Sequence, residues 1–208
     1  MSTGRVGRPR SRAVSEDGRT PRQEILDAAA ALFAESGFAA TSTRAIAESV
    51  GMRQASLYHH FAGKDEILLE LLEASVRPTL DLVDAIRAAA PDAVAALHAL
   101  VVADVGTVLA GPLGIAALYV APETQHPRFA PFHEHRRQLG AVYTDLAAQV
   151  VPPGHPVTPE VVGATCLHLV EMAANLPRPP AGAPDLAEQI AAACLGAAGV
   201  RSPVAGRR

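Results

Sequence analysis

Apolar residues at helical spacing, in segments divided by proline, most restrict what this chain can fold into. In the first such segment the apolar side chains recur at i, i+3, i+4, i+7 and i+8, which places them on one face of a helix. They are Ile25, Ala28, Ala29, Leu32 and Phe33. Hydrophobic residues make up 49% of the chain, and the alternation of valine, threonine and tyrosine that marks strands is almost absent. The sequence therefore predicts an all-α fold.

Capping residues and prolines mark where the helices begin and end. Thr20 is suited to cap the first helix, Pro21 to occupy its first position, and Gly37 to end it. A longer periodic segment, residues 65–87, contains Pro78, which should kink or divide it. Further helices are predicted at about residues 92–109, 113–121, 128–150, 159–176 and 184–199, with a rigid proline-rich loop at 176–184.

Two short helices joined by a glycine turn follow the first helix. The stretch "TSTRAIAESVG", residues 41–51, is too short for an independent helix and must dock against its neighbours. Gly51 suits a tight turn, and "MRQASLYHHF" then predicts a second short helix, which Gly63 ends. Two short helices with such a turn are the helix-turn-helix pattern, here at about residues 42–61.

A polar cluster in the second short helix raises the question of what it binds. His59 and His60 would point about 100° apart on a helix, whereas metal-binding pairs sit at i, i+4. Ser56 has no base at a fitting spacing, so catalysis is not supported. Leu57 and Phe61 should turn inward, which leaves donors for bases and phosphates on the other side. A solvated face without a partner is the alternative, but the arrangement of three helices favours DNA.

The chain's net charge of −3 is unevenly distributed. Residues 1–64 hold nine basic and six acidic side chains, whereas residues 65–208 hold nine basic and fifteen acidic ones. A basic N-terminal part suggests contact with a polyanion. No apolar run reaches the roughly 20 residues that span a bilayer, and no secretory signal is recognisable. The two cysteines, Cys166 and Cys194, lie far apart in sequence. We expect a cytoplasmic protein without a membrane partner, cofactor or metal site.

Residues 22–68 resemble the DNA-binding domain of the TetR family of bacterial transcriptional regulators. The matching pieces are "ILDAAAALFAESGFAATSTRAIAESVGM" and "LYHHFAGKDEILLELL", which cover about a quarter of the chain. The resemblance implies a helix-turn-helix DNA-binding domain at residues 21–67, behind a disordered basic arm at residues 1–20. It implies a helical effector-binding and dimerisation domain at residues 68–208.

The resemblance also implies roles for single residues. Thr43 and Tyr58 would hold phosphates, and Lys64 would lie near the DNA backbone at the next helix start. Many relatives have Ser-Lys-Gly where this chain has Arg53-Gln54-Ala55, so Arg53 or Gln54 would supply the usual lysine contact. The DNA contacts implied in full are Thr43, Arg44, Arg53, Gln54, Ala55, Ser56, Tyr58, His59 and Lys64.

The N-terminal arm contains Gly-Arg-Pro-Arg at residues 7–10. This stretch resembles an arm that enters the minor groove, where arginine is favoured. A solubilising tail is an equal alternative.

The C-terminal region carries polar-tipped or aromatic side chains on otherwise apolar helices, as ligand pockets do. The candidates for an effector site are Tyr119, His126, Phe129, Phe132, Tyr143, His168, Glu171 and Met172. Each is also compatible with an ordinary core position. The last two helices are rich in Ala, Gly, Val, Leu and Cys, and "GATCLHLVEMAANL" is apolar nearly all round, which favours a four-helix homodimer interface. An ordinary core helix is the alternative.

The function expected from the resemblance is a repressor that a small effector releases from a palindromic operator. The chain contains no enzyme motif of the usual classes. A helical interaction module without specific DNA binding is the alternative.

Overall fold

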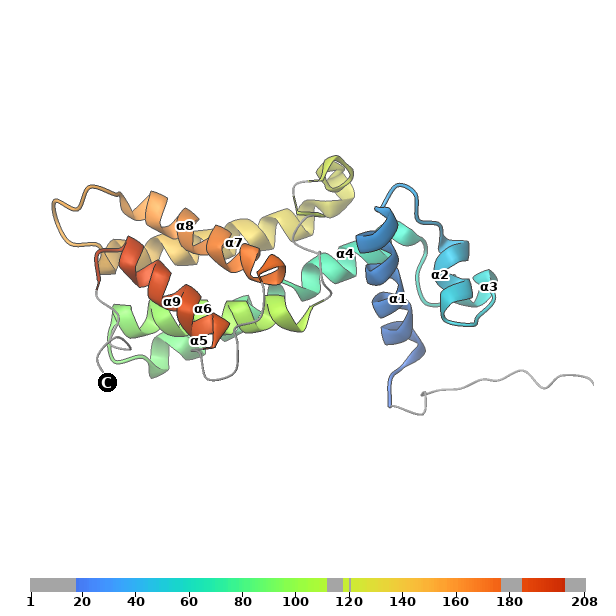
Figure 1. The fold of residues 1–208 in the computed structure, drawn as a ribbon, viewed down its shortest axis with the longest axis horizontal. Coiled ribbons are helices and arrows are strands. Elements are labelled where there is room, and N and C mark those ends of the chain that lie inside the picture. The colour runs from blue at the N-terminus through green and yellow to red at the C-terminus, as the bar shows by residue number, and fades with distance from the viewer. Residues whose placement is uncertain (1–17, 112–117, 120, 177–184, 201–208) are drawn as a thin grey trace, which may run out of the picture.

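The computed structural model describes residues 18–111, 118–119, 121–176 and 185–200 (Figure 1). The GRPR stretch, most of the helix predicted at residues 113–121 and most of the proline-rich loop lie outside the described residues. All regular structure in the described part is helical, which confirms the predicted fold class. The α-helices are α1 (Pro21–Ser36), α2 (Thr43–Ser49), α3 (Gln54–Leu57), α4 (Lys64–Ala74), α5 (Arg77–Ala89), α6 (Ala93–Ala110), α7 (Ala130–Val150), α8 (Pro159–Met172) and α9 (Leu186–Ala197). Short 3₁₀ turns are η2 (Pro122–Gln125), η3 (Pro127–Phe129) and η4 (Ala173–Asn175).

α1 begins and ends where its capping residues predict. Thr20 and Gln23 form a reciprocal capping box around Pro21, which fixes the first turn. Gly37 has φ 82°, and its N–H donates to the Phe33 carbonyl at 3.0 Å. The buried face consists of Ile25, Ala29, Ala30 and Phe33. Ala28 and Leu32, which the periodicity predicts on this face, are only half-buried at its edge.

The segment containing Pro78 is divided rather than kinked. α4 ends at Ala74 and α5 begins at Arg77, so Pro78 lies in the first turn of α5. A proline there removes no helical hydrogen bond, because the first N–H groups of a helix have no partner within it. The domain boundary expected between residues 67 and 68 falls inside α4. This helix packs against α1 as well as against α5 and α7.

α6 is the central helix of the C-terminal bundle and packs against α5, α7, α8 and α9. Its buried side chains include Leu97, Leu100, Val101 and Val105. Among the described helices, α6 alone is long and apolar enough to cross a membrane, judged by length and composition only. Its position between four other helices is that of a core helix. α1, α2 and α3 lie at the far end of the molecule, and α4 connects them to the bundle (Figure 1).

Candidate nucleic-acid interface

The turn between α2 and α3 depends on a glycine. Ser42 caps α2 by accepting a hydrogen bond from a backbone N–H of its first turn. Gly51 then adopts φ 68°, a left-handed conformation that side chains disfavour. The Met52 N–H donates to the Ala47 carbonyl at 2.9 Å, which closes the turn. The predicted helix-turn-helix is therefore present, at the predicted place.

α3 is a single helical turn, shorter than the stretch MRQASLYHHF predicts. Hydrogen-bonded turns continue beyond it, and the Phe61 N–H donates to the Leu57 carbonyl at 3.0 Å. Leu57 and Phe61 are 0% and 1% exposed, so they anchor the segment from beneath as predicted. On the outer side of this segment the expected DNA contacts are exposed, except Ser56, which is half-buried. The exposed ones are Arg53, Gln54, Ala55, Tyr58 and His59.

Three of the expected contact residues are hydrogen-bonded to one another. The Gln54 amide nitrogen donates to the Thr43 hydroxyl at 2.9 Å and to the Tyr58 hydroxyl at 3.3 Å. The two hydroxyl oxygens are 3.2 Å apart and share a hydrogen bond. These bonds join the first turn of α2 to α3 on the exposed surface. They arrange two hydroxyl groups, which suit phosphate oxygens, around one amide.

Arg44 is exposed on α2 and pairs with Glu48, one helical turn away, at 2.8 Å. Because both side chains are largely in solvent, the pair contributes little to stability. The pair leaves Arg44 free to exchange its partner for a phosphate.

Lys64 begins α4, and its ammonium group is directed into the protein. It donates to the backbone carbonyls of Phe38, Ala39 and Thr41 at 2.8, 3.2 and 2.9 Å. It also lies 4.5 Å from the centre of the Phe38 ring. An ammonium has three hydrogens to donate, and these three carbonyls use them. Lys64 therefore fastens the start of α4 to the loop between α1 and α2, while its contact with DNA stays a prediction.

The eight residues expected at an effector site do not form one group. Tyr119, Phe129, Phe132 and Tyr143 are buried in the core of the bundle. Tyr119 donates to the Ser75 hydroxyl at 2.7 Å, and its ring lies 5.1 Å from that of Phe132. Glu171 is linked to this pair through Arg136 on α7. It accepts two hydrogen bonds from Arg136, at 2.6 and 2.9 Å, and the Arg136 guanidinium lies 5.9 Å from the centre of the Tyr119 ring.

The remaining three candidates lie on the surface. The ring of His126 is exposed and accepts from Arg128. His168 and Met172 are exposed on the outer face of α8, and the His168 Nδ1 is 2.7 Å from the Ala164 carbonyl. They line an apolar groove of about 450 Å³ on that face, away from the buried group. Helical spacing alone does not say which side of α8 faces the core.

Asp104 is a buried carboxyl group on α6 that sequence reasoning missed. It is 2% exposed and accepts from Thr79 at 3.0 Å and from Tyr143 at 2.8 Å. Burial raises the pKa of Asp104 to about 7, although both hydrogen bonds oppose the rise. Burial and the neighbouring carboxyl raise the pKa of Tyr143 well above its usual value. A single acid within the apolar stretch "ALVVADVGTVLA" is the signal that would have identified it.

Over the described ranges, no three His, Cys, Asp or Glu side chains gather in a way that would hold a metal ion. Cys166 on α8 and Cys194 on α9 are both buried and reduced.

The helix-turn-helix segment matches a known family. Residues 25–71 match the family described as "Bacterial regulatory proteins, tetR family". Over 51 residues the chain is 55% identical to the HTH-type transcriptional repressor KstR2 of Mycobacterium tuberculosis (strain ATCC 25618 / H37Rv). That match covers 24% of this chain and 26% of the relative, so it spans about a quarter of the length of that curated protein.

The likeness to solved structures covers almost the whole chain. AmtR of Mycobacterium smegmatis is 40% identical with a TM-score of 0.79, and 91% of each chain is covered. The ketosteroid transcriptional regulator KstR2 of Mycobacterium tuberculosis is 26% identical with a TM-score of 0.73, over 91% of this chain and 99% of that one. The likeness therefore extends from the helix-turn-helix through the C-terminal helices.

Proposed function

Since this chain belongs to the TetR family of bacterial regulatory proteins, we propose that it is a transcriptional regulator that binds double-stranded DNA as a homodimer. Residues 21–67 would form the DNA-binding domain and residues 68–208 the effector-binding and dimerisation domain, with α4 shared between them. Repression is the favoured direction, because the curated relative KstR2 is a repressor. Binding to the chromosome would place the protein in the cytoplasm.

One observation carries the proposal: the outer side of the segment that begins at Arg53 is exposed, while Leu57 and Phe61 are buried beneath it. A helix anchored in this way can enter the major groove without losing core contacts. Arg53, Ala55, Ser56 and His59 would then meet base edges. The Thr43 and Tyr58 hydroxyls would meet phosphates.

The hydrogen bonds of Gln54 refine its proposed role. Its amide holds the Thr43 and Tyr58 hydroxyls, so it would organise the phosphate contacts as well as reading a base. Gln54→Ala should then weaken binding to all sequences and also change which sequence is preferred. Tyr58→Phe removes a phosphate donor together with its hydrogen bonds to Thr43 and Gln54, and it should weaken binding uniformly.

The homodimer is proposed to form through the outer faces of α8 and α9. On α8, Val161 and Met172 are 54% and 50% exposed at the two ends of the apolar groove. On α9, the small residues Ala193 and Gly196 are exposed at helical spacing beside Gln189. A face of small residues next to an apolar groove allows helices from two copies to approach closely. A dimer would present two α3 segments to a palindromic operator.

The effector is proposed to act on the bundle around Tyr119, Arg136 and Glu171. These side chains join α7 and α8 to the segment before η2, and Tyr119 reaches Ser75 at the end of α4. A small molecule that separates them would act next to the helix shared with the DNA-binding domain. Release from DNA would follow if the effector favours a dimer whose α3 segments are wrongly spaced.

Selection from a random duplex library, followed by fluorescence anisotropy across a salt series, tests the proposal. A regulator should enrich a palindromic sequence and bind it at least about a thousandfold more tightly than unselected DNA. Its affinity should fall steeply with salt as counterions are released. Absence of binding even at low salt would instead favour a helical interaction module.

A further inference from the structure

Arg22 lies in the first turn of α1, outside the helix-turn-helix, yet it contacts the end of the α3 segment. Its backbone position is fixed by the capping box of Thr20 and Gln23 and by Pro21 before it. From there the side chain crosses to the loop between α3 and α4. The contact joins residues 38 positions apart in sequence.

The guanidinium group of Arg22 makes contacts in three directions. One terminal nitrogen donates to the His60 carbonyl at 2.6 Å. The Nε donates to Glu70 on α4 at 3.0 Å, and the other terminal nitrogen donates to the second oxygen of the same carboxylate. The group also lies over the Phe61 ring, 4.0 Å from its centre. The hydrogen bonds that Arg22 donates to the Glu70 carboxylate raise the pKa of Arg22, so the cation is retained. A planar group with five donors suits this arrangement, and lysine would not reproduce it.

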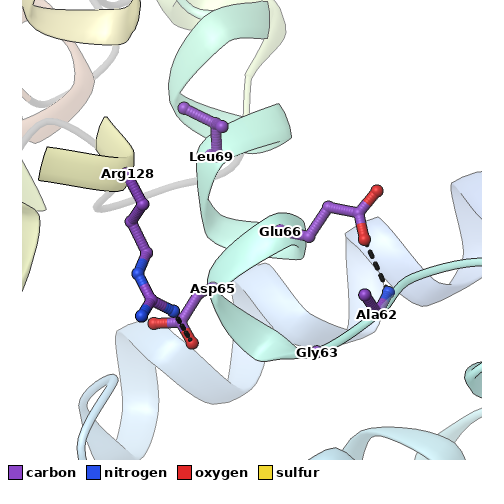
Figure 2. A pocket seen from close by; sticks show the side chains of 6 residues that line it. All are labelled: Ala62, Gly63, Asp65, Glu66, Leu69 and Arg128. Carbon is purple, nitrogen blue, oxygen red and sulfur yellow. Dashed lines mark hydrogen bonds and ion pairs between the residues drawn. The ribbon is translucent and has the colours of Figure 1, made fainter. Parts of the chain in front are cut away.

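α4, the partner of Arg22, is also tied to the C-terminal bundle. Asp65 pairs with Arg128 at 2.6 Å across a hollow of about 290 Å³, and Figure 2 shows the two side chains facing each other there. In the same view Glu66 turns the other way and accepts from the Ala62 N–H at 2.5 Å. At its penultimate residue, α4 places the Glu73 carboxylate 2.8 Å from His135 on α7. α4 is thus bonded to the bundle on one side and to the end of the α3 segment on the other.

We propose that Arg22 is a positioning residue for DNA recognition: by bonding His60, Phe61 and Glu70 together, it sets the orientation of the α3 segment relative to α4. The inference rests on the proposed function, because orientation matters only if this segment reads DNA. Arg22 itself does not touch the bases or phosphates. Its effect is on specific binding, since a tilted reading segment still meets the phosphate backbone while its base contacts are lost.

Two substitutions with opposite charge changes separate positioning from simple electrostatics. Arg22→Met removes a positive charge, and Glu70→Gln removes a negative one from its partner. Positioning predicts that both weaken binding to the selected duplex, by at least about fivefold, the lower end of what one lost base contact costs. Both should leave affinity for unselected DNA and the salt dependence unchanged. If Arg22 contacted a phosphate, Arg22→Met would reduce the salt slope by about 0.9, and Glu70→Gln would tighten binding.

Arg22→Lys and Arg137→Met serve as matched controls. Lysine keeps the charge but not the forked geometry, so Arg22→Lys should restore little of the specific affinity. Arg137 forms an exposed pair with Glu134 on α7, and its replacement by Met should leave specific binding unchanged. The active fraction of each variant is measured by titration at high DNA concentration, so that unfolded protein does not count as weak binding.

Amide hydrogen exchange gives a readout that does not need DNA. Arg22→Met and Glu70→Gln should raise exchange at residues 58–62 by about tenfold or more, whereas the interior of α6 should exchange as in the wild type. Wild-type exchange at residues 58–62 in both variants would overturn the inference. Unchanged affinity for the selected duplex would also overturn it, as would a loss of affinity that a reduced active fraction explains. If the wild type bound no DNA, the proposed function would fail, and exchange would still decide whether Arg22 holds this segment.

Discussion

Replacing Asp104 by asparagine should stabilise the protein at neutral and alkaline pH. The substitution keeps the shape of the side chain and removes its charge. The amide oxygen of asparagine can accept from one hydroxyl, and its NH₂ group can donate to the other, so Thr79 and Tyr143 keep partners. What changes is the free energy of holding a carboxylate inside the bundle.

The magnitude follows from the pKa of Asp104, which burial raises from 3.8 to about 7. Below pH 4 the carboxyl is protonated in both the folded and the unfolded chain, and its charge has no effect on stability. Between pH 4 and pH 7 the unfolded chain loses this proton first, so folding becomes less favourable as the pH rises. Above pH 7 the full cost applies, about 4 kcal/mol at 1.36 kcal/mol per pKa unit. The cost at pH 5 is about 2 kcal/mol on the same basis.

Urea unfolding at pH 5 and pH 8, at one protein concentration, measures this difference. The gain in unfolding free energy from Asp104→Asn should be about 2 to 3 kcal/mol larger at pH 8 than at pH 5. Comparing two pH values cancels any constant change in packing. Asp81→Asn, at an exposed carboxyl on α5, is the control and should show no such dependence. Equal effects of Asp104→Asn at the two pH values would refute the reasoning.

Three further substitutions test separate parts of the structure. Leu57→Ala should lower the unfolding free energy by about 2–5 kcal/mol in urea titrations, because this side chain is fully buried; a surface-like loss below about 0.5 kcal/mol would contradict the anchoring of α3. Lys64→Met should raise amide exchange at residues 38–41, since its ammonium is held by three carbonyls; wild-type exchange at these residues would contradict this role of Lys64. Val161→Glu should shift the mass measured by light scattering from two chains to one, because a carboxylate would replace an exposed apolar side chain of the α8 groove; a dimer of unchanged stability would place the interface elsewhere.

Local chemistry explains which parts of the fold were predictable. The ends of α1 follow from Thr20, Pro21 and Gly37, because capping depends on residues within one turn of each other. The turn at Gly51 and the inward direction of Leu57 follow from spacing and conformational freedom in the same way. The division at Pro78 was one of two outcomes that the sequence allowed.

Contacts between distant segments explain what was not predictable. Lys64 has a fitting charge for DNA, but the carbonyls that hold it lie more than 20 positions away in sequence. Arg22 and Asp104 acquire their roles from partners on other helices, and no spacing rule connects them. His168 and Met172 share polar or flexible character with pocket residues, yet the packing of α8 turns them outward. The residue types at these two positions suggested a pocket, but the direction in which the side chains point depended on the tertiary structure.

The central claim is that the exposed side of the α3 segment lies against duplex DNA, and site-specific photocrosslinking tests it most directly. A photoreactive phenylalanine analogue is placed at His59, or at Asp145 on the exposed side of α7, and each protein is irradiated with the selected duplex. We expect a crosslink to DNA from position 59 and none from position 145. A protein that binds the duplex and crosslinks from position 145 but not from position 59 would contradict the account.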